Sequence, residues 1–259
     1  MAPAHTRPVL SCQDVEKIYG SRDNVTRALD GVSFDVAAGE YVAVMGPSGS
    51  GKTTMLNCVS TIDRPTSGHI YVDGQDITAL RSSQLSRFRR ERLGFVFQDS
   101  NLLDTLTARE NIALALTINH TPAREVPGRV EDVAARLGVS EVLDKFPHQM
   151  SGGQKQRVAA ARAIVTNPSL VLADEPTGAL DSKNSRRLLE SLEALNAEGA
   201  TIIMVTHDSF AASYARRALF LKDGRIWSEI VRGSKTRKQF FDEIMDVVSF
   251  LGGEGADVR

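Results

Sequence analysis

The sequence is poor in cysteine, in net charge and in long apolar runs. Its 259 residues include only two cysteines, Cys12 and Cys58, and so small a number excludes a disulfide framework and suits a reducing cytosol. The formal net charge of −1 differs from the strongly basic balance of nucleic-acid-binding chains, so we expect no nucleic-acid partner. No apolar run approaches the roughly 20 residues that cross a bilayer, so we expect any membrane role to come through a partner.

We also expect no lipoprotein signal at the start of the sequence. The tripeptide Leu10-Ser11-Cys12 superficially resembles a lipoprotein cleavage site, but residues 1–9 include Pro, His, Thr and Arg and no apolar segment of the kind that precedes such a site. The hydrophobic content of 42% and the charged content of 24% are ordinary for a globular protein. The length allows one large domain or two small ones.

The most informative stretch is EYVAVMGPSGSGKTT, residues 40–54. A short apolar strand leads into a glycine-rich turn, and a helix is expected to begin near Lys52. The stretch matches the phosphate-binding pattern GxxxxGK[ST]. The nucleotide-binding residues predicted in it are Gly46, Pro47, Ser48, Gly49, Ser50, Gly51, Lys52, Thr53 and Thr54.

The chemistry of a nucleotide explains this pattern. Glycine lets backbone N–H groups close around a polyphosphate where a Cβ atom would clash, and the start of the helix adds the positive end of its dipole. Lys52 would reach the β- and γ-phosphates, and the Thr53 hydroxyl would hold Mg²⁺. The alternative, a flexible Gly/Ser linker, is disfavoured by the apolar strand in front. We therefore predict a nucleotide-binding protein.

Further candidates lie at the ends of apolar strands. Residues 170–173 are apolar and lead into Asp174 and Glu175. If this strand runs parallel to the phosphate-loop strand, Asp174 reaches the Mg²⁺ shell and Glu175 polarises the attacking water as general base. The alternative is an acidic turn. Gln98 and His207 also end strands, and an imidazole there could contact a γ-phosphate, but each is weak alone.

A second glycine-rich helix start follows later in the chain. Ser151, Gly152, Gly153 and Gln154 open a predicted helix, whose free N–H groups and positive dipole end could bind an anion. The alternative is simple capping of the helix by Ser151.

The pattern of apolar residues predicts the organisation of the chain. Two early strands within residues 8–36 suggest a small antiparallel sheet, and helical spacing dominates residues 99–165. Strands and helices then alternate from residue 170, which predicts a parallel sheet covered on both faces. The arginine-rich segment 80–91 invites a nucleic-acid interpretation, but no aromatic residues interleave for base stacking, so a solvated helix face is favoured.

In this order and spacing, the segments from Tyr19 to about Gly224 resemble the ATP-binding-cassette ATPases. The resemblance implies an α/β fold: a RecA-like P-loop NTPase core with a parallel sheet, an N-terminal antiparallel β subdomain and an inserted α-helical signature subdomain. It places the ATPase domain over residues 1–232, with the helical subdomain at about 99–165 and a tail helix at 233–259. Met150 departs from the Leu that usually begins the signature, with little expected effect.

The resemblance also implies cofactors and roles. The cofactors are ATP and Mg²⁺, with Thr53, Gln98 and Asp174 toward the metal. The catalytic set would be Glu175, His207, Gln98 and Lys52. Tyr19 would stack on adenine, Gly46 to Thr53 would form the Walker A loop, Ser151 to Gln154 the signature, Asp174 and Glu175 the Walker B pair, Ala179 to Asp181 the D-loop, and Gln98 and His207 the two switch residues.

Within the family, the segments ALDGVSFDV, NLLDTLTARENI and MVTHDSFAASYARRALFLKDGRI resemble the ATPases of bacitracin- and lantibiotic-resistance transporters. This implies a permease partner with a large extracellular domain, an associated sensor histidine kinase, and a place at the cytoplasmic face of the membrane. It also implies a head-to-tail homodimer, in which the signature of one copy closes on the ATP of the other.

Other functions stay open at this point. The chain could serve a lipoprotein-release or macrolide-export complex, or it could be a non-transporting regulatory ATPase of the cell-division type. A ribosome- or DNA-acting ABC protein is disfavoured because those chains carry two cassettes or a long coiled-coil insertion. A kinase would leave the signature and Glu175 without a role.

The C-terminal tail carries an apolar stripe. Phe240, Ile244, Val247 and Leu251 recur at i, i+4, i+7 and i+11, which is one face of a helix. The helix either packs on the chain's own surface, the favoured interpretation, or docks to a partner.

Overall fold

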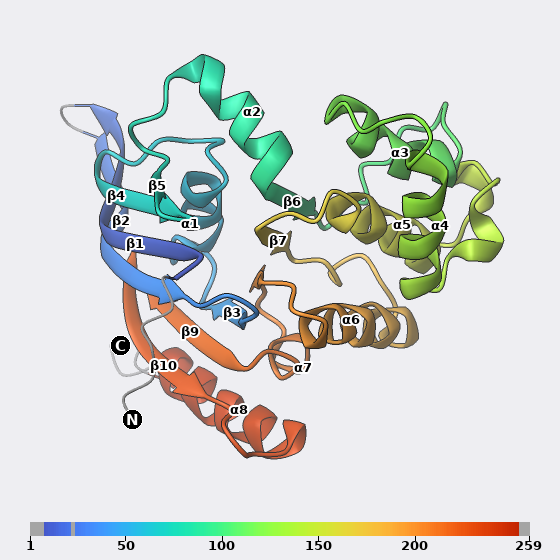
Figure 1. Ribbon diagram of the computed structural model, residues 1–259. Coiled ribbons are helices and arrows are strands. Elements are labelled where there is room, and N and C mark those ends of the chain that lie inside the picture. Colours follow the sequence, from blue (N-terminus) through green and yellow to red (C-terminus); the bar gives the residue numbers. More distant parts are fainter. Residues whose placement is uncertain (1–7, 22–23, 254–259) are drawn as a thin grey trace, which may run out of the picture.

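The computed structural model describes residues 8–21 and 24–253, which form two sheets and a set of helices (Figure 1). Most of the segment before the lipoprotein-like tripeptide, residues 1–7, lies outside the described residues, as does the end of the predicted tail, residues 254–259. Among the helices of the described residues, none is both long and apolar enough to cross a membrane.

The larger sheet has six strands in the order β10-β9-β3-β8-β7-β6, with the phosphate-loop strand β3 near its middle. Neighbouring strands run parallel except β10, which is antiparallel to β9. The strands are β3 (Tyr41–Met45), β6 (Leu93–Val96), β7 (Leu170–Asp174), β8 (Ile202–Val205), β9 (Arg217–Lys222) and β10 (Arg225–Val231).

The smaller sheet is antiparallel and has the order β2-β1-β4-β5. It lies on the left in Figure 1 and shares a hydrophobic core with the larger sheet. Its strands are β1 (Leu10–Ser21), β2 (Asn24–Val36), β4 (Ser67–Val72) and β5 (Gln75–Asp76).

The helices cover the parallel sheet, and three of them form a separate lobe: α3, α4 and α5, on the right in Figure 1. The α-helices are α1 (Lys52–Val59), α2 (Ser82–Arg92), α3 (Ala108–Ile118), α4 (Val126–Arg136), α5 (Gly152–Ile164), α6 (Ser182–Ala197), α7 (Ser209–Ala212) and α8 (Arg237–Gly253), with short 3₁₀ turns at η1 (Ser140–Val142) and η2 (Pro147–Gln149).

The alternation of side chains along β3 divides the core in two. Val42 and Val44 point into the core shared with the antiparallel sheet and α1, while Tyr41, Ala43 and Met45 point into the core shared with the helices. All five are at most 1% exposed. Because both faces of β3 are buried, the strand is an apolar run without polar alternation. The phosphate loop that follows it is therefore anchored between two packed layers.

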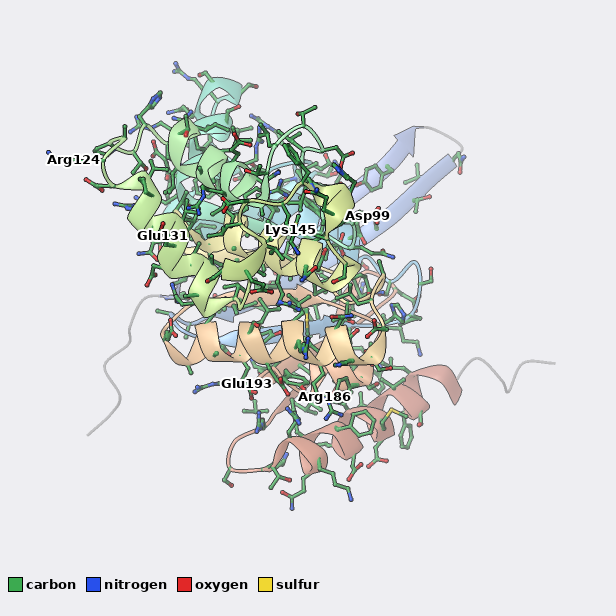
Figure 2. The ribbon with its side chains drawn as sticks, turned by 90° about the vertical axis from the view of Figure 1, so that its right-hand side faces the viewer. Asp99, Arg124, Glu131, Lys145, Arg186 and Glu193 are labelled. Atoms are coloured by element: carbon green, nitrogen blue, oxygen red, sulfur yellow. The ribbon has the colours of Figure 1, made fainter. Side chains whose placement is uncertain are left out.

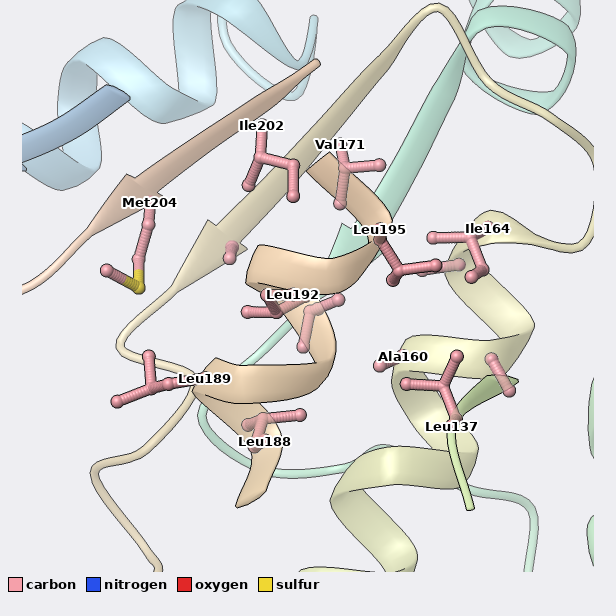
Figure 3. Close-up of a cluster of buried hydrophobic side chains, with 14 of the residues drawn as sticks. Leu137, Ala160, Ile164, Val171, Leu188, Leu189, Leu192, Leu195, Ile202 and Met204 are labelled. Atoms are coloured by element: carbon pink, nitrogen blue, oxygen red, sulfur yellow. The ribbon is translucent and has the colours of Figure 1, made fainter. Parts of the chain in front are cut away.

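Helix α6 shows how the helical core is built. Leu188, Leu189, Leu192 and Leu195 are at most 2% exposed and lie toward Val171, Ile202 and Met204 of β7 and β8, with residues of α5 beside them (Figure 3). Burying each leucine is worth about 1.5–3 kcal/mol. This packing holds the loop between β7 and α6, which carries Glu175.

The tail helix α8 packs on the chain itself. Phe240 and Ile244 are fully buried, and Val247, Val248 and Leu251 pack against the same helical core. The Arg237 guanidinium carbon lies 4.3 Å from the centroid of the Tyr214 ring, next to α7. Figure 2 shows α8 below α6, whose labelled residues Arg186 and Glu193 lie on the side toward it. Of the two interpretations of the stripe, the structure therefore favours self-packing, while the division at residues 232 and 233 stays a prediction.

The predicted fold class is confirmed. Helix α6 begins at Ser182, because the Asp181 side chain accepts a hydrogen bond from Asn184 N at 2.9 Å and caps the first turn. Strand β10 continues to Val231, which pairs with Arg217. The basic segment forms α2, where Leu85 and Phe88 are buried and Arg87 is exposed.

Candidate functional site

The phosphate loop borders a cavity of about 550 Å³ at the end of β3. Residues far apart in the sequence meet there, because parallel strands end at the same edge of the sheet. The lining residues are Thr26, Arg27, Ala28, Gly46, Pro47, Ser48, Gly49, Gly51, Lys52, Thr53, Thr54, Glu175 and His207. The structure thus brings most of the predicted phosphate-loop residues together with two of the predicted catalytic residues.

Two glycines of the loop have no room for a side chain. Gly46 has φ of 149°, and a Cβ atom there would lie 2.1 Å from the Leu221 carbonyl oxygen. Gly51 has φ of 103°, and a Cβ atom would lie 2.4 Å from the Ala28 carbonyl oxygen. Both conformations are ones that glycine adopts readily and L-residues rarely do. The glycines are therefore required by backbone geometry even before a nucleotide is considered.

Lys52 lies at the first position of α1 and its ammonium group is turned back over the loop. Its Nζ donates to the carbonyl oxygens of Gly46 at 2.8 Å and Pro47 at 2.9 Å. Burial lowers the pKa of Lys52, and the nearby carboxylates of Glu175 and Asp174 act in the opposite direction. The loop thus holds a cation directly above its own backbone, where it would meet a phosphate.

Asp174 and Glu175 come at the end of β7, as predicted. Burial raises the pKa of Asp174, the charge of Glu175 raises it further, and Lys52 partly compensates. Glu175 has φ of 45°, an uncommon left-handed conformation for a residue with a side chain. The turn at Glu175 therefore directs two adjacent carboxylates to one edge of the sheet.

His207 is bonded to Glu175. Its Nδ1 lies 2.8 Å from Glu175 Oε1, and its backbone N–H donates to the same oxygen at 3.1 Å. Thr206 Oγ1 donates to the other carboxylate oxygen at 3.3 Å and accepts from Asp208 N at 3.0 Å. With the proton on Nδ1, the exposed Nε2 is free to accept a hydrogen bond in the cavity. The imidazole and carboxylate thus form one hydrogen-bonded unit.

Four other predicted residues, Ser50, Asp174, Gln98 and Tyr19, lie outside the lining of this cavity. Gln98 follows β6, and a Cβ atom built on Gly178 would lie 3.1 Å from its Nε2, so the glutamine packs on the loop after Glu175. Tyr19 is paired with Thr26 across the β1–β2 ladder, and Thr26 lines the cavity. Tyr19 therefore lies on the strand next to the one that borders the cavity.

The signature residues do not join the cavity within one chain. Ser151 caps α5, since its Oγ accepts from Gln154 N at 3.3 Å and its N–H donates to Gln154 Oε1 at 2.9 Å. Ser151 and Gly152 are exposed. A Cβ atom on Gly153 would lie 2.2 Å from Asn184 Oδ1, so α5 packs closely on α6 there. In one chain, the capping interpretation describes this segment fully.

The chemistry of the donors fits the implied cofactors. The glycine cradle and Lys52 suit a polyphosphate, and the Thr53 hydroxyl, Gln98 amide and Asp174 carboxylate are oxygen donors of the kind that Mg²⁺ prefers. No group of three or more His, Cys, Asp or Glu side chains gathers as a metal site in the described parts of the chain. A cation here would therefore depend on a few protein oxygens plus phosphate and water, which is the usual situation of Mg²⁺ beside a nucleotide.

Some lining residues were not predicted from the sequence. Thr26, Arg27 and Ala28 come from β2 and reach the cavity only through the packing of the antiparallel sheet, so no local pattern identifies them. Thr206 does not line the cavity, but it bonds Glu175. Its position directly before His207 at the end of a strand is the sequence signal that could have identified it.

Comparisons with known proteins agree with the geometry. The sequence model of the family described as "ABC transporter" matches residues 29–178. The chain is 47% identical to "Bacitracin export ATP-binding protein BceA" of Halalkalibacterium halodurans, over 95% of this chain and 97% of that protein. It is 48% identical to "ABC transporter ATP-binding protein YxdL" of Bacillus subtilis, over 96% and 97%.

Two further similarities bear on assembly. The chain is 45% identical to "Macrolide export ATP-binding/permease protein MacB" of Hyphomonas neptunium over 86% of this chain but only 35% of that protein. Among solved structures, "Dimeric structure of a post-hydrolysis state of the ATP-binding cassette MJ0796 bound to ADP and Pi" superposes with a TM-score of 0.78 and 39% identity, covering 86% of this chain and 98% of that one.

Proposed function

Because the chain belongs to the ABC transporter family and carries its ATP-hydrolysing domain, we propose that it powers a membrane transporter for peptide antibiotics of the bacitracin and lantibiotic type. The observation that carries this proposal is the similarity to BceA, which spans 95% of this chain and 97% of that protein. That similarity therefore continues well beyond the segment of residues 29–178 that the general family pattern covers.

The proposed chemistry follows from the cavity. Lys52 and the loop N–H groups bind the phosphates, and Thr53, Gln98 and Asp174 would hold Mg²⁺, which would supply positive charge against the phosphates. Glu175 acts as general base on the attacking water. His207, bonded to Glu175 at 2.8 Å, holds the carboxylate in orientation and contacts the γ-phosphate.

A second copy of the chain completes the site in this proposal. Ser151 to Gln154 lie outside the cavity of their own chain, and Ser151 and Gly152 are exposed at the start of α5, where an anion is favoured. A head-to-tail homodimer would place these groups on the ATP of the partner copy. The relative MJ0796 is described as dimeric.

The proposed docking site for the permease is a groove on the surface of this chain. A cavity of about 430 Å³ lies between α2, β6, α3 and α5, and its lining in the described part of the chain includes Arg89, Arg90 and Arg162 and no carboxylate. The Nε atom of Arg90 is buried without a hydrogen-bond partner among the described residues. The occupant that this charge suits is a cytoplasmic helix of the permease that presents a carboxylate or its negative C-terminal end. The complex would then lie at the cytoplasmic face of the membrane, with the permease carrying the large extracellular domain and contacting a sensor histidine kinase.

Replacement of one apolar residue in this groove tests the docking. Ile118 lines the groove and is 47% exposed, so Ile118→Asp should abolish co-purification with the permease while ATP binding by the isolated chain stays unchanged. Ile62→Asp is the matched control, because Ile62 is also exposed, at 58%, and lies outside the groove. Loss of the permease with both variants, or with neither, would contradict this docking site.

The transported substrate is tested with the assembled complex. The chain and its permease are purified together, and ATPase activity is measured with bacitracin, with a macrolide and with a lipoprotein. Stimulation by bacitracin alone supports the proposal. Stimulation by the macrolide or the lipoprotein would assign the chain to one of those complexes, and no stimulation by any of the three would favour a regulatory ATPase.

A further inference from the structure

Three side chains beside the phosphate loop form one connected group. Asp63 Oδ1 accepts from Lys17 Nζ at 2.6 Å, and Asp63 Oδ2 accepts from the Tyr19 hydroxyl at 2.7 Å. Lys17 Nζ also lies 4.8 Å from the centroid of the Tyr19 ring and donates to the Arg64 carbonyl oxygen at 2.7 Å. One carboxylate thus holds both the hydroxyl of the ring and the cation above it.

The group lies next to the phosphate cavity. Tyr19 pairs with Thr26, a residue that lines the cavity. The pKa of Tyr19 is raised by burial and by the bond to Asp63, and a hydrogen bond with Thr54 of the phosphate-loop helix acts in the opposite direction. The tyrosine is nevertheless 40% exposed. It therefore touches the loop on one side and solvent on another.

The two faces of the Tyr19 ring are not equivalent. Lys17 is two residues away on the same strand, so its side chain lies on the same face of β1, and only 12% of that side chain is exposed. An ammonium held over an aromatic face is attracted by the ring quadrupole. This face is therefore covered, and a flat ligand can stack only on the opposite face.

We propose that Asp63 and Lys17 are positioning residues that fix the Tyr19 ring so that its uncovered face receives the base of the nucleotide. This inference rests on the proposed function, ATP hydrolysis at this cavity, and on the stacking of Tyr19 on adenine that the family resemblance implies. The contribution of the two residues is to orient the platform: Asp63 fixes the hydroxyl end, and Lys17 covers the back of the ring. Neither residue touches the nucleotide in this arrangement.

A purely structural role for the same contacts makes a different prediction. Ile18 N donates to Thr66 Oγ1 at 3.0 Å, and Thr66 N donates to the Glu16 carbonyl oxygen at 2.7 Å, so the segment after α1 is also tied to β1 by other bonds. If Asp63 merely added to these ties, its loss would affect the whole site. Binding of the phosphates and binding of the base would then weaken together.

The experiment compares a ligand that has a base with one that lacks it. Dissociation constants of ATP and of inorganic tripolyphosphate are measured by calorimetry on the whole chain without Mg²⁺, and their ratio reports the contribution of the base. Tyr19→Ala should reduce this ratio roughly 10- to 100-fold, the usual range for loss of base stacking on an aromatic ring. Asp63→Ala and Lys17→Met should each reduce it about 3- to 10-fold, the effect of one lost polar anchor, with tripolyphosphate affinity unchanged.

Two further variants distinguish a loss of the Tyr19–Asp63 bond from a general disturbance of the fold. Tyr19→Phe retains the ring but loses the bond to Asp63, so it should resemble Asp63→Ala. Asp76→Asn is the matched control, since that carboxylate bonds Thr78 and His69 in the same sheet region and should leave the ratio unchanged.

Each outcome has a distinct meaning. A reduced ratio with Tyr19→Ala but not with Asp63→Ala or Lys17→Met would overturn the positioning roles. An equal loss of ATP and tripolyphosphate binding with Asp63→Ala would also overturn them and favour the structural role. An unchanged ratio with Tyr19→Ala would show that Tyr19 is not the platform, whereas ATP hydrolysis itself, measured separately, would still stand.

Discussion

Two glycine-rich segments of this chain open a helix, and they differ in how the helix start is satisfied. At α1 the residue before the helix is Gly51, and no side chain caps the first turn. At α5 the residue before the helix is Ser151, and the Ser151 and Gln154 side chains bond each other's backbone N–H groups. The first helix start leaves its N–H groups for a ligand, whereas the second is largely satisfied by the chain itself.

The surroundings of the two segments differ in the same sense. The α1 start borders a cavity of about 550 Å³ with Lys52, Glu175 and His207 on its walls. Partial burial lowers the pKa of Lys52 and raises the pKa of the nearby Asp174. Ser151 lies on the surface. Catalytic sites commonly carry such electrostatic costs in the free protein. The same residue types therefore build an open phosphate site in one place and a capped helix in the other, and the two differ in their surroundings.

The largest effect is expected from Glu175→Gln, which tests whether the α1 side alone carries the chemistry. Removing a general base costs about 10²–10⁴-fold in rate, while the phosphate cradle stays intact, so ATP should bind with nearly unchanged affinity. Steady-state ATPase activity and equilibrium ATP binding are the measurements. Glu190→Gln, at an exposed glutamate on α6, is the control, and activity of the Glu175 variant within a few-fold of the wild type would remove Glu175 from this role.

The next largest effect is expected from Ser151→Arg, which tests the α5 side. An arginine there blocks the helix start, so hydrolysis should fall by about 10²-fold, comparable to the loss of one anion-stabilising donor. ATP binding by the single chain should persist, because Ser151 lies outside its own cavity. Ser140→Arg, also at an exposed position in the same lobe, is the control. Equal loss of binding and hydrolysis would place Ser151 in the site of its own chain and would contradict the head-to-tail dimer.

Lys52→Ala should weaken ATP binding by the single chain, which Ser151→Arg should leave intact. The Lys52 ammonium makes charge-assisted contacts, each worth about 1.5–3 kcal/mol, so ATP affinity of the isolated chain should fall roughly 10- to 100-fold. Lys155→Ala is the informative comparison, because Lys155 follows the other glycine-rich segment and should leave this affinity unchanged. Calorimetric titration with ATP distinguishes the two, and similar losses in both variants would erase the difference between the two helix starts.

The fold could be predicted largely because its signals are local. The apolar strand before Gly46, the carboxylates after residues 170–173 and the helical stripe through Phe240 are each visible within about ten residues of sequence, and the periodicity rules read such segments well. Self-packing of the stripe also follows from physics, since two fully buried side chains, Phe240 and Ile244, are costly to leave in water.

The parts that could not be predicted depend on contacts across long separations. Ala28 reaches the phosphate cavity only because β2 packs over the loop, and Gly51 must be glycine partly because of the Ala28 carbonyl oxygen. The bonds of Asp63 to Lys17 and Tyr19 join residues 44 to 46 positions apart. No periodic pattern marks Asp63, so its place beside the predicted adenine contact is visible only in the structure.

The smallest effect is expected from Asp174→Asn, and it tests whether the α1 side carries an electrostatic cost before ATP binds. Burial and the neighbouring Glu175 raise the pKa of Asp174 in the folded chain. A raised pKa stabilises the fold only while the group is protonated, so that contribution is lost as pH rises from the ordinary value of 3.8 through the raised pKa. At pH 7 the wild type therefore holds a carboxylate that the fold disfavours, whereas the amide introduced by the substitution is neutral at every pH.

The variant should accordingly melt higher than the wild type at pH 7, by roughly 1–4 °C, since 1 kcal/mol corresponds to about 2–4 °C in a domain of this size. The difference should narrow as pH falls, because Asp174 then becomes protonated and neutral as well. Asp181→Asn is the control with the opposite sign: hydrogen bonds from Asn184 lower the pKa of Asp181, so this variant should not gain stability at pH 7. Thermal melting of the nucleotide-free chain across this pH range measures both. A lower melting temperature for Asp174→Asn at pH 7 would mean that the residues around the phosphate loop stabilise the Asp174 carboxylate before a nucleotide binds. The α1 and α5 helix starts would then differ only in whether they border a cavity.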